Sequence, residues 1–314
     1  MPYVTRWAVM AIVLGIAMIL LSASLVEAGE QRTVNAGGVA RTYYVAGDTA
    51  ANTGPRPLVI MLHGAGGNGA QAVRQYGWER KAEREGFVVA GPDAWRPFPD
   101  WPANLLTNPR FWNDGSARGN LAIRTSDDVG FLDAMVDDIA RFAAIDRNRV
   151  YVTGFSSGAG MAQRLAVERA NRYAAVAPIS GIAVIPPTSP VRAMPFLYLS
   201  GDSDPLNPVQ GGRVRLPWGN TFTKPGHGAI TQRWRELDGC PPPTRSTPAP
   251  AVRLELASPC RGGVEVRYVL VEGMGHRWAG GGRDVLPESI VGPASNAINV
   301  TDTVWDFLRR WRLR

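Results

Sequence analysis

Short apolar runs that alternate with amphipathic helical segments are the feature of this sequence that most constrains its fold. Continuous apolar runs of four to eight residues are typical of strands covered on both faces of a sheet. Helical spacing lies between them, for example at Phe131, Met135, Ile139 and Phe142. This alternation predicts an α/β fold in which a doubly wound, mostly parallel sheet carries helices on both faces. The predicted strands are residues 41–45, 58–62, 87–90, 150–153, 174–177, 196–199 and 264–271.

The composition excludes several classes of protein. With 45% hydrophobic and 19% charged residues among 314, the chain can bury a large core, which excludes a disordered or fibrous protein. Lys and Arg (34) outnumber Asp and Glu (27). The arginines are nevertheless scattered except at 309–314, where they follow a predicted helix, so we expect no nucleic-acid partner. No Cys/His cluster has structural-zinc spacing, and we expect no metal site.

The first 28 residues have the layout of a secretory signal peptide. Arg6 precedes an uncharged run over residues 7–21, and small residues suited to cleavage lead to Ala28. A transmembrane anchor is the alternative, but the run is shorter than the 18 or so residues that a span needs. We therefore expect a secreted or periplasmic protein with no stable membrane insertion after cleavage. No repeat or interdomain linker follows, so residues 29–314 are predicted to form a single catalytic domain.

The two cysteines, Cys240 and Cys260, flank a proline-rich stretch. In an oxidising compartment we expect them to form one disulfide, which would stabilise the fold by about 3 kcal/mol through loop closure. Two buried free thiols are the alternative.

Residues 150–160 contain the pattern most informative about chemistry. Gly154, Ser156 and Gly158 form a G-x-S-x-G pattern between a predicted strand and a predicted helix, which is the context of a nucleophile elbow. The sharp turn strains the serine backbone and leaves space only for small residues two positions before and after it. Ser156 is therefore the candidate nucleophile.

A serine hydroxyl needs a base to accept its proton and a carboxylate to orient that base. His276 follows the last predicted strand and is the candidate base, whereas His227 is predicted to be a helix cap or a surface residue. The acid should lie between serine and histidine in the chain. Asp204, four residues after the strand over 196–199, is the candidate, with Asp202 as the alternative.

Residues 62–68 follow a strand and resemble the glycine-rich loop that supplies backbone N–H donors to an oxyanion. The candidate donors are the amides of Ala65 and Ser157. His63 is expected to brace this loop. A phosphate-binding loop is excluded because the segment lacks the Lys-Ser/Thr ending.

Taken together, these segments resemble the secreted polyhydroxybutyrate depolymerase-like esterases, which are related to bacterial feruloyl and acetylxylan esterases in the α/β-hydrolase superfamily. The resemblance implies that Ser156, Asp204 and His276 form a triad that hydrolyses esters without a cofactor. It extends to Gly77-Trp78-Glu79, Gly86-Phe87-Val88-Val89, Phe111-Trp112-Asn113-Asp114-Gly115, Asp127-Asp128-Val129-Gly130-Phe131, Asp204-Pro205-Leu206-Asn207-Pro208 and Gly275-His276-Arg277-Trp278.

The chain departs from the family in two ways. Ala65 stands where many relatives have a cysteine. The linker and surface-binding module of depolymerases that attack solid polyester are not seen, so soluble hydroxyalkanoate oligomers or small esters are the expected substrates. The alternatives are a feruloyl or acetylxylan esterase acting on plant cell walls, a peptidase, or a catalytically silent wall-binding protein.

Three further residues are candidates for substrate binding. Trp278 and Trp112 could line an aryl-binding cleft, although core packing is an equal expectation for Trp112. Asn207 could bond the substrate or shape a turn. The sequence predicts no oligomeric state.

Overall fold

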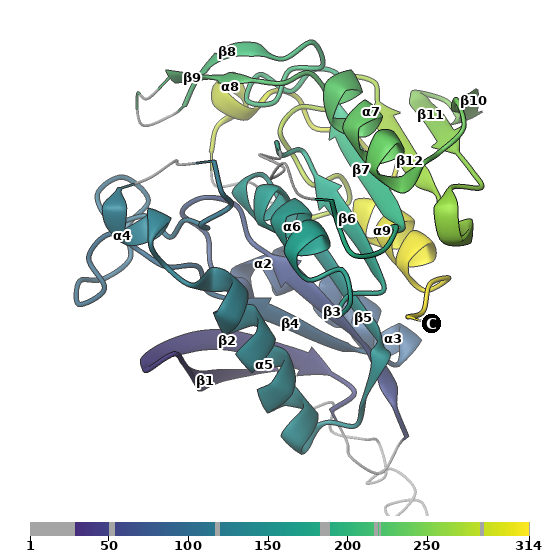
Figure 1. Cartoon of the computed structure of the whole chain (residues 1–314). Coiled ribbons are helices and arrows are strands. Elements are labelled where there is room, and N and C mark those ends of the chain that lie inside the picture. The colour runs from purple at the N-terminus through teal and green to yellow at the C-terminus, as the bar shows by residue number, and fades with distance from the viewer. Residues whose placement is uncertain are drawn as a thin grey trace, which may run out of the picture.

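The computed structural model of the protein describes residues 29–49, 54–116, 120–182, 189–216, 219, 221–282 and 286–313. The expected signal peptide, residues 1–28, lies outside them. Within the described residues a ten-stranded sheet runs in the order β1-β2-β4-β3-β5-β6-β7-β12-β11-β10 (Figure 1). The order places strands from distant parts of the sequence side by side.

The centre of this sheet is parallel, from β4 through β3, β5, β6 and β7 to β12, and antiparallel strands flank it on both sides. The predicted α/β fold with a mostly parallel sheet is confirmed. The central strands are β4 (Val88–Pro92), β3 (Arg56–Leu62), β5 (Ile145–Phe155), β6 (Ala175–Ile179), β7 (Phe196–Gly201) and β12 (Val266–Val271). The flanking strands are β1 (Glu30–Ala36), β2 (Val39–Gly47), β11 (Val252–Ala257) and β10 (Thr244–Ala249).

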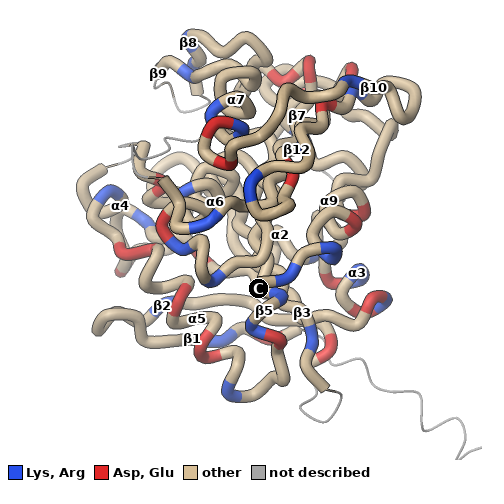
Figure 2. Tube along the Cα trace, turned by 45° about the vertical axis from the view of Figure 1, so that its right-hand side comes forward, with Lys and Arg blue, Asp and Glu red and all other residues tan. Residues whose placement is uncertain are grey.

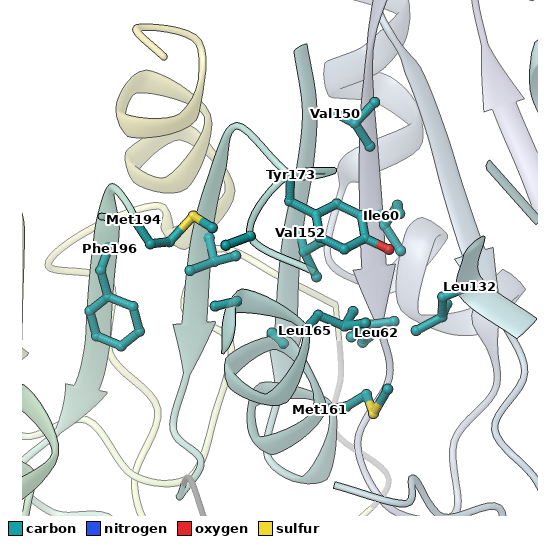
Figure 3. Close-up of a cluster of buried hydrophobic side chains, with 14 of the residues drawn as sticks. Ile60, Leu62, Leu132, Val150, Val152, Met161, Leu165, Tyr173, Met194 and Phe196 are labelled. Atoms are coloured by element: carbon teal, nitrogen blue, oxygen red, sulfur yellow. The ribbon is translucent and has the colours of Figure 1, made fainter. Parts of the chain in front are cut away.

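Helices cover both faces of the sheet, as the doubly wound prediction requires. Along β3, Ile60 and Leu62 belong to one apolar cluster while Val59 and Met61 belong to the other, because successive side chains of a strand point to opposite faces. Figure 3 shows the first cluster, in which Met161 and Leu165 of a covering helix lie against the strand side chains. On that face are α5 (Asp128–Phe142), α6 (Ser157–Glu168) and α7 (His227–Asp238). On the other are α2 (Gly69–Gln75), α3 (Trp78–Glu85) and α9 (Val300–Leu308).

The segment after Asp204 leaves the main sheet and forms a separate two-stranded hairpin, β8 (Gly212–Arg215) with β9 (Thr221–Lys224). Figure 1 shows this hairpin at the top of the molecule, near the short helix α8 (Glu288–Val291). A small apolar cluster that contains Leu206, Val214 and Val291 packs the hairpin against that helix. The remaining short elements are α4 (Leu121–Arg124) and the 3-10 turn η1 (Arg261–Gly263).

A disulfide joins Cys240 to Cys260, so the predicted pairing is confirmed. It connects the residue that follows the C-cap of α7 to the turn after β11. The edge of the sheet is thereby tied to the helix that covers it.

Asp238, the last residue of α7, is buried beneath this edge. Its Oδ1 accepts a hydrogen bond from the Met194 N–H at 3.1 Å, and Oδ2 has no partner within the described residues. Burial disfavours the carboxylate and raises the pKa of Asp238 to about 7.

Charged residues of both signs are interspersed along the chain (Figure 2). The arginines near the C-terminus pair with acids: Arg309 with Asp306, Arg310 with Glu265, and Arg312 with Asp146. These pairs dock the tail onto the fold. In the part of the chain that the structure describes, no helix has the length and apolar character needed to cross a bilayer.

Candidate active site

Ser156 occupies a strained turn between β5 and α6. Its φ of 55° and ψ of −114° lie outside the regions that non-glycine residues prefer. A Cβ at Gly154 would lie 2.4 Å from the Gly158 carbonyl oxygen, and a Cβ at Gly158 would lie 2.3 Å from the Leu62 carbonyl oxygen. Both neighbours are backbone atoms that cannot move aside, which explains the glycines of the G-x-S-x-G pattern. The geometry is that of a nucleophile elbow.

Asp204 lies in the loop after β7 and is 2% exposed. Its Oδ1 accepts hydrogen bonds from the N–H groups of Leu206 at 2.9 Å and Asn207 at 2.8 Å. Its Oδ2 accepts a hydrogen bond from Nδ1 of His276 at 2.8 Å. The alternative acid, Asp202, is exposed, and its Oδ1 accepts from the Gly273 N–H at 2.8 Å. The structure therefore brings Asp204, and not Asp202, to the candidate base.

His276 lies in the loop after β12, and this loop packs tightly against the acid loop. A Cβ at Gly201, the last residue of β7, would lie 1.8 Å from the Met274 carbonyl oxygen. The His276 N–H donates to the Val291 carbonyl at 2.5 Å, which holds the loop from its other side. The imidazole lies beside the elbow, with its ring centroid 4.7 Å from that of Phe155. Ser156 and His276 line the same cavity.

The predicted oxyanion loop follows β3 and lines the same cavity. The Gly66 N–H donates to the Arg110 carbonyl at 2.8 Å, and the Gly67 N–H donates to the Gly64 carbonyl at 3.1 Å. Among the described residues, no acceptor is bonded to the backbone N–H of Ala65 or of Ser157. Both residues line the cavity together with Ser156, so both candidate donors are kept available for a ligand oxygen.

His63 braces this loop from within, in keeping with the sequence-based expectation. Its Nε2 accepts from the Ala94 N–H at 3.0 Å, so Nδ1 carries the proton and donates to the Gly64 carbonyl at 2.6 Å. Burial disfavours the charged imidazolium and lowers the pKa of His63 to about 4. Trp112 Nε1 donates to the His63 carbonyl at 2.9 Å.

The cavity has a volume of about 300 Å³. Its wall combines the loops that carry the candidate catalytic groups with apolar side chains from the surrounding loops and helices. The apolar side chains on the wall are Ala72, Tyr76, Leu105, Phe111, Phe155, Leu206, Leu216, Leu286 and Val291. Polar side chains from α2 and its N-cap, Asn68, Gln71 and Gln75, also contribute.

The structure does not place the three candidate substrate-binding residues on this wall. Trp112 is fully buried and supports the oxyanion loop through His63. Trp278 is 4% exposed, donates to Thr301 Oγ1 at 2.9 Å and stacks on Tyr76, with 4.6 Å between ring centroids. Both tryptophans are packing residues, because their large apolar surface is covered by other side chains.

Asn207 is also fully buried, behind the acid loop. Its Nδ2 donates to the Tyr198 hydroxyl at 2.8 Å, and its carbonyl accepts from Nε2 of His227 at 2.8 Å. Asn207 shapes the turn that holds Asp204, which was the alternative interpretation of this residue.

The expectation that His227 is a helix cap or a surface residue was wrong. His227 is the first residue of α7, after the N-cap Gly226, and it is buried between Tyr198 and Tyr268. The Tyr268 hydroxyl lies 2.9 Å from Nδ1, and burial lowers the pKa of the imidazole. His227 thus supports Asp204 indirectly, through Asn207.

Several cavity residues could not be found from the sequence. Leu105, Leu216, Lys224 and Leu286 lie in loops or at the end of a short strand and belong to no pattern with a chemical meaning. Among the described residues, no group of His, Cys, Asp and Glu is arranged to hold a metal ion.

Comparison with known proteins identifies the family. A family model described as Esterase PHB depolymerase matches residues 41–212, which is more than half of the chain. The chain belongs to this family. The resemblance seen in the motifs is confirmed, and the protein is a carboxylic ester hydrolase.

Relatives and solved structures agree with this assignment. NocK of Nocardia uniformis subsp. tsuyamanensis, which is named as an esterase, is 30% identical over 88% of this chain and 81% of its own. Feruloyl esterase B of Piromyces equi is 28% identical over 73% of this chain and 40% of its own.

Two structures share the fold of this esterase. A thermostable esterase has a TM-score of 0.54 at 15% identity, over 92% of this chain and 64% of its own. An acetyl xylan esterase from Aspergillus awamori has a TM-score of 0.51 at 14% identity, over 79% of this chain and 94% of its own. At these identities the likeness concerns the fold alone.

Proposed function

We propose that this esterase hydrolyses carboxylic esters through an acyl-enzyme on Ser156, with His276 as general base and Asp204 as its orienting carboxylate. One observation carries the proposal. The buried Asp204 carboxylate accepts the Nδ1 proton of His276 at 2.8 Å, and this imidazole lines the same cavity as the strained Ser156.

The hydrogen bond to Asp204 fixes the His276 tautomer, because a proton on Nδ1 leaves Nε2 of the neutral ring as an acceptor. In the proposed reaction, Ser156 Oγ attacks the ester carbonyl carbon and its proton passes to Nε2. The backbone N–H groups of Ala65 and Ser157 stabilise the oxyanion. The imidazolium then returns its proton to the departing alcohol oxygen. A water molecule repeats the sequence on the acyl-enzyme and releases the acid.

The cavity supports small or oligomeric esters as substrates. Its volume of about 300 Å³ is at the small end of the range for ligand pockets. Leu105, Leu206 and Leu286 give it an apolar wall suited to a short aliphatic chain. Soluble hydroxyalkanoate oligomers or small esters fit this space better than the surface of a solid polymer.

Feruloyl or acetylxylan ester hydrolysis is the second candidate. The rings of Tyr76, Phe111 and Phe155 line the cavity and offer contacts to an aromatic acyl group. Feruloyl esterases and an enzyme named as a bifunctional acetylxylan esterase/xylanase are among the relatives. Release of ferulate, acetate and hydroxybutyrate from matched substrates by one preparation separates the two candidates.

The mechanism is tested with Ser156→Ala and the control Ser157→Ala. Loss of the Ser156 hydroxyl should lower kcat for 4-nitrophenyl butyrate by at least about 10⁴-fold, because nucleophile and base act as a unit. Ser157→Ala keeps the backbone N–H and should stay within about threefold of the parent. A fluorophosphonate should label the parent and the Ser157 variant but not the Ser156 variant. Undiminished hydrolysis by Ser156→Ala would rule out the mechanism, and an unlabelled, inactive parent would favour a catalytically silent protein.

We further propose that the protein is exported to the periplasm or beyond the cell. The Cys240–Cys260 disulfide and the signal-like composition of residues 1–28 support this location. N-terminal sequencing of the protein recovered outside the cytoplasm should begin at Gly29. An uncleaved N-terminus in a membrane fraction would contradict the proposal.

A further inference from the structure

A buried cation forms part of the cavity wall. Lys224, the last residue of β9, lines the cavity and is 6% exposed. It is one of two lysines in the sequence, and the other, Lys81, pairs with Glu85 and Asp302 away from the cavity. Among the described lining residues, Lys224 is the one whose side chain is a lysine or arginine.

The Lys224 side chain is held in place by uncharged groups. Its Nζ donates to the Leu206 carbonyl, and it lies 5.3 Å from the centroid of the Phe222 ring. Neither contact neutralises the ammonium, which carries three N–H donors and can serve the Leu206 carbonyl and a ligand oxygen together.

The charges that face the cavity are unbalanced. No aspartate or glutamate lies among the described lining residues. Asp204, the nearby acid, directs its carboxylate to His276 and to two backbone N–H groups. The field in the cavity is therefore positive and favours an anionic group on the ligand, because a buried charge is stabilised by a partner of opposite sign.

We propose that Lys224 binds a carboxylate of the substrate, so that the preferred esters carry a free carboxylate a short distance from the scissile bond. The acid end of a linear hydroxyalkanoate oligomer has this chemistry. The inference rests on the proposed hydrolysis at Ser156 and adds the charge of its substrate. Lys224 takes no part in bond making; it holds the carboxylate while water cleaves the ester.

A purely structural role for Lys224 makes a different prediction. If the side chain only ties β9 to the acid loop through the Leu206 carbonyl, its loss disturbs Asp204 and slows every ester equally. If it binds a carboxylate, its loss slows anionic esters alone. The ratio of the two rates separates these roles.

The experiment compares the linear dimer of 3-hydroxybutyrate as its free acid and as its primary amide, which differ in charge at one end. The parent should have the higher kcat/KM for the acid. Lys224→Met should lower kcat/KM for the acid by about 10- to 100-fold, the range for loss of a hydrogen bond to a charged group, and change the amide less than about threefold. Lys81→Met, which removes the other lysine, should leave the acid-to-amide ratio unchanged.

A second measurement needs no variant. Free 3-hydroxybutyrate should inhibit hydrolysis of 4-nitrophenyl butyrate by the parent more strongly than 3-hydroxybutyramide does. Equal inhibition, or equal slowing of both dimers by Lys224→Met, overturns the inference. The proposed function fails separately, if 4-nitrophenyl butyrate hydrolysis does not depend on Ser156.

Discussion

Replacing Asp204 with asparagine tests the proposed triad at its most informative point. In the parent, Oδ1 accepts from the N–H groups of Leu206 and Asn207, and Oδ2 accepts from Nδ1 of His276. The two backbone donors require an oxygen at the first position, so the amide of Asp204→Asn must turn its NH₂ group toward His276. Nδ1 must then act as the acceptor, and the ring proton moves to Nε2.

An imidazole protonated at Nε2 cannot accept the Ser156 proton. We therefore expect kcat for 4-nitrophenyl butyrate to fall by about 10⁴-fold, the loss known for the equivalent change in a serine protease, which corresponds to about 5.5 kcal/mol in the barrier. The volume and the two backbone hydrogen bonds are preserved, so the thermal midpoint should change little. Initial rates and calorimetry on one preparation measure both quantities.

Asp202→Asn is the matched control. The Asp202 Oδ1 accepts from the Gly273 N–H and from the Ser203 hydroxyl, and an amide oxygen can accept both bonds. This variant should keep kcat within about threefold, because the hydrogen bonds of the loop survive. If Asp204→Asn retained more than a tenth of the parent rate, or if Asp202→Asn lost as much, the tautomer argument would be refuted.

Three further predictions concern stability. Gly158→Ala should lower the free energy of unfolding by about 3 kcal/mol or more, because its Cβ meets backbone atoms; a urea midpoint like that of the parent would contradict this. Replacing Cys240 and Cys260 with serine should remove about 3 kcal/mol while leaving kcat at 25 °C unchanged, measured by denaturation and initial rates; an unchanged free energy of unfolding would show that the cross-link is not stabilising. The pKa of Asp238, about 7 when folded, exceeds the unfolded value, so stability is lost as pH rises from about 4 through 7. Asp238→Asn should therefore be more stable than the parent at pH 8, by up to about 4 kcal/mol, and similar to it at pH 4; an equal gain at both pH values would exclude titration of this group.

The central part of the fold could be predicted because its strands are buried on both faces. Residues 58–62 and 196–199 are continuous apolar runs, and both lie within central strands of the sheet. The edge strands β1, β10 and β11 were missed because much of their surface is exposed and their side chains follow no apolar run. The N-cap of α5 is Asp127, not the predicted Thr125 or Ser126, because α4 extends to Arg124 and delays the helix start.

The candidate catalytic residues could be chosen from the sequence because each follows a strand whose carboxyl end meets the same edge of the sheet. Chain order and loop length pointed to Asp204 and His276, which the structure brings within hydrogen-bonding distance. The cavity wall could not be predicted in the same way. Lys224 enters the cavity from a hairpin outside the main sheet, and the burial of Trp112 and Asn207 depends on tertiary packing that no local pattern reveals.

The hairpin β8–β9 and the short helix α8 lie apart from the parallel strands that carry the elbow, the acid and the imidazole. Together they contribute Lys224 and Val291 to the wall, whereas the reactive groups emerge from the ends of β5, β7 and β12. Reactivity and selectivity are thus encoded in different stretches of polypeptide. Exchanging residues 212–224 for those of another esterase should redirect substrate choice while the rate of a small, uncharged ester is preserved.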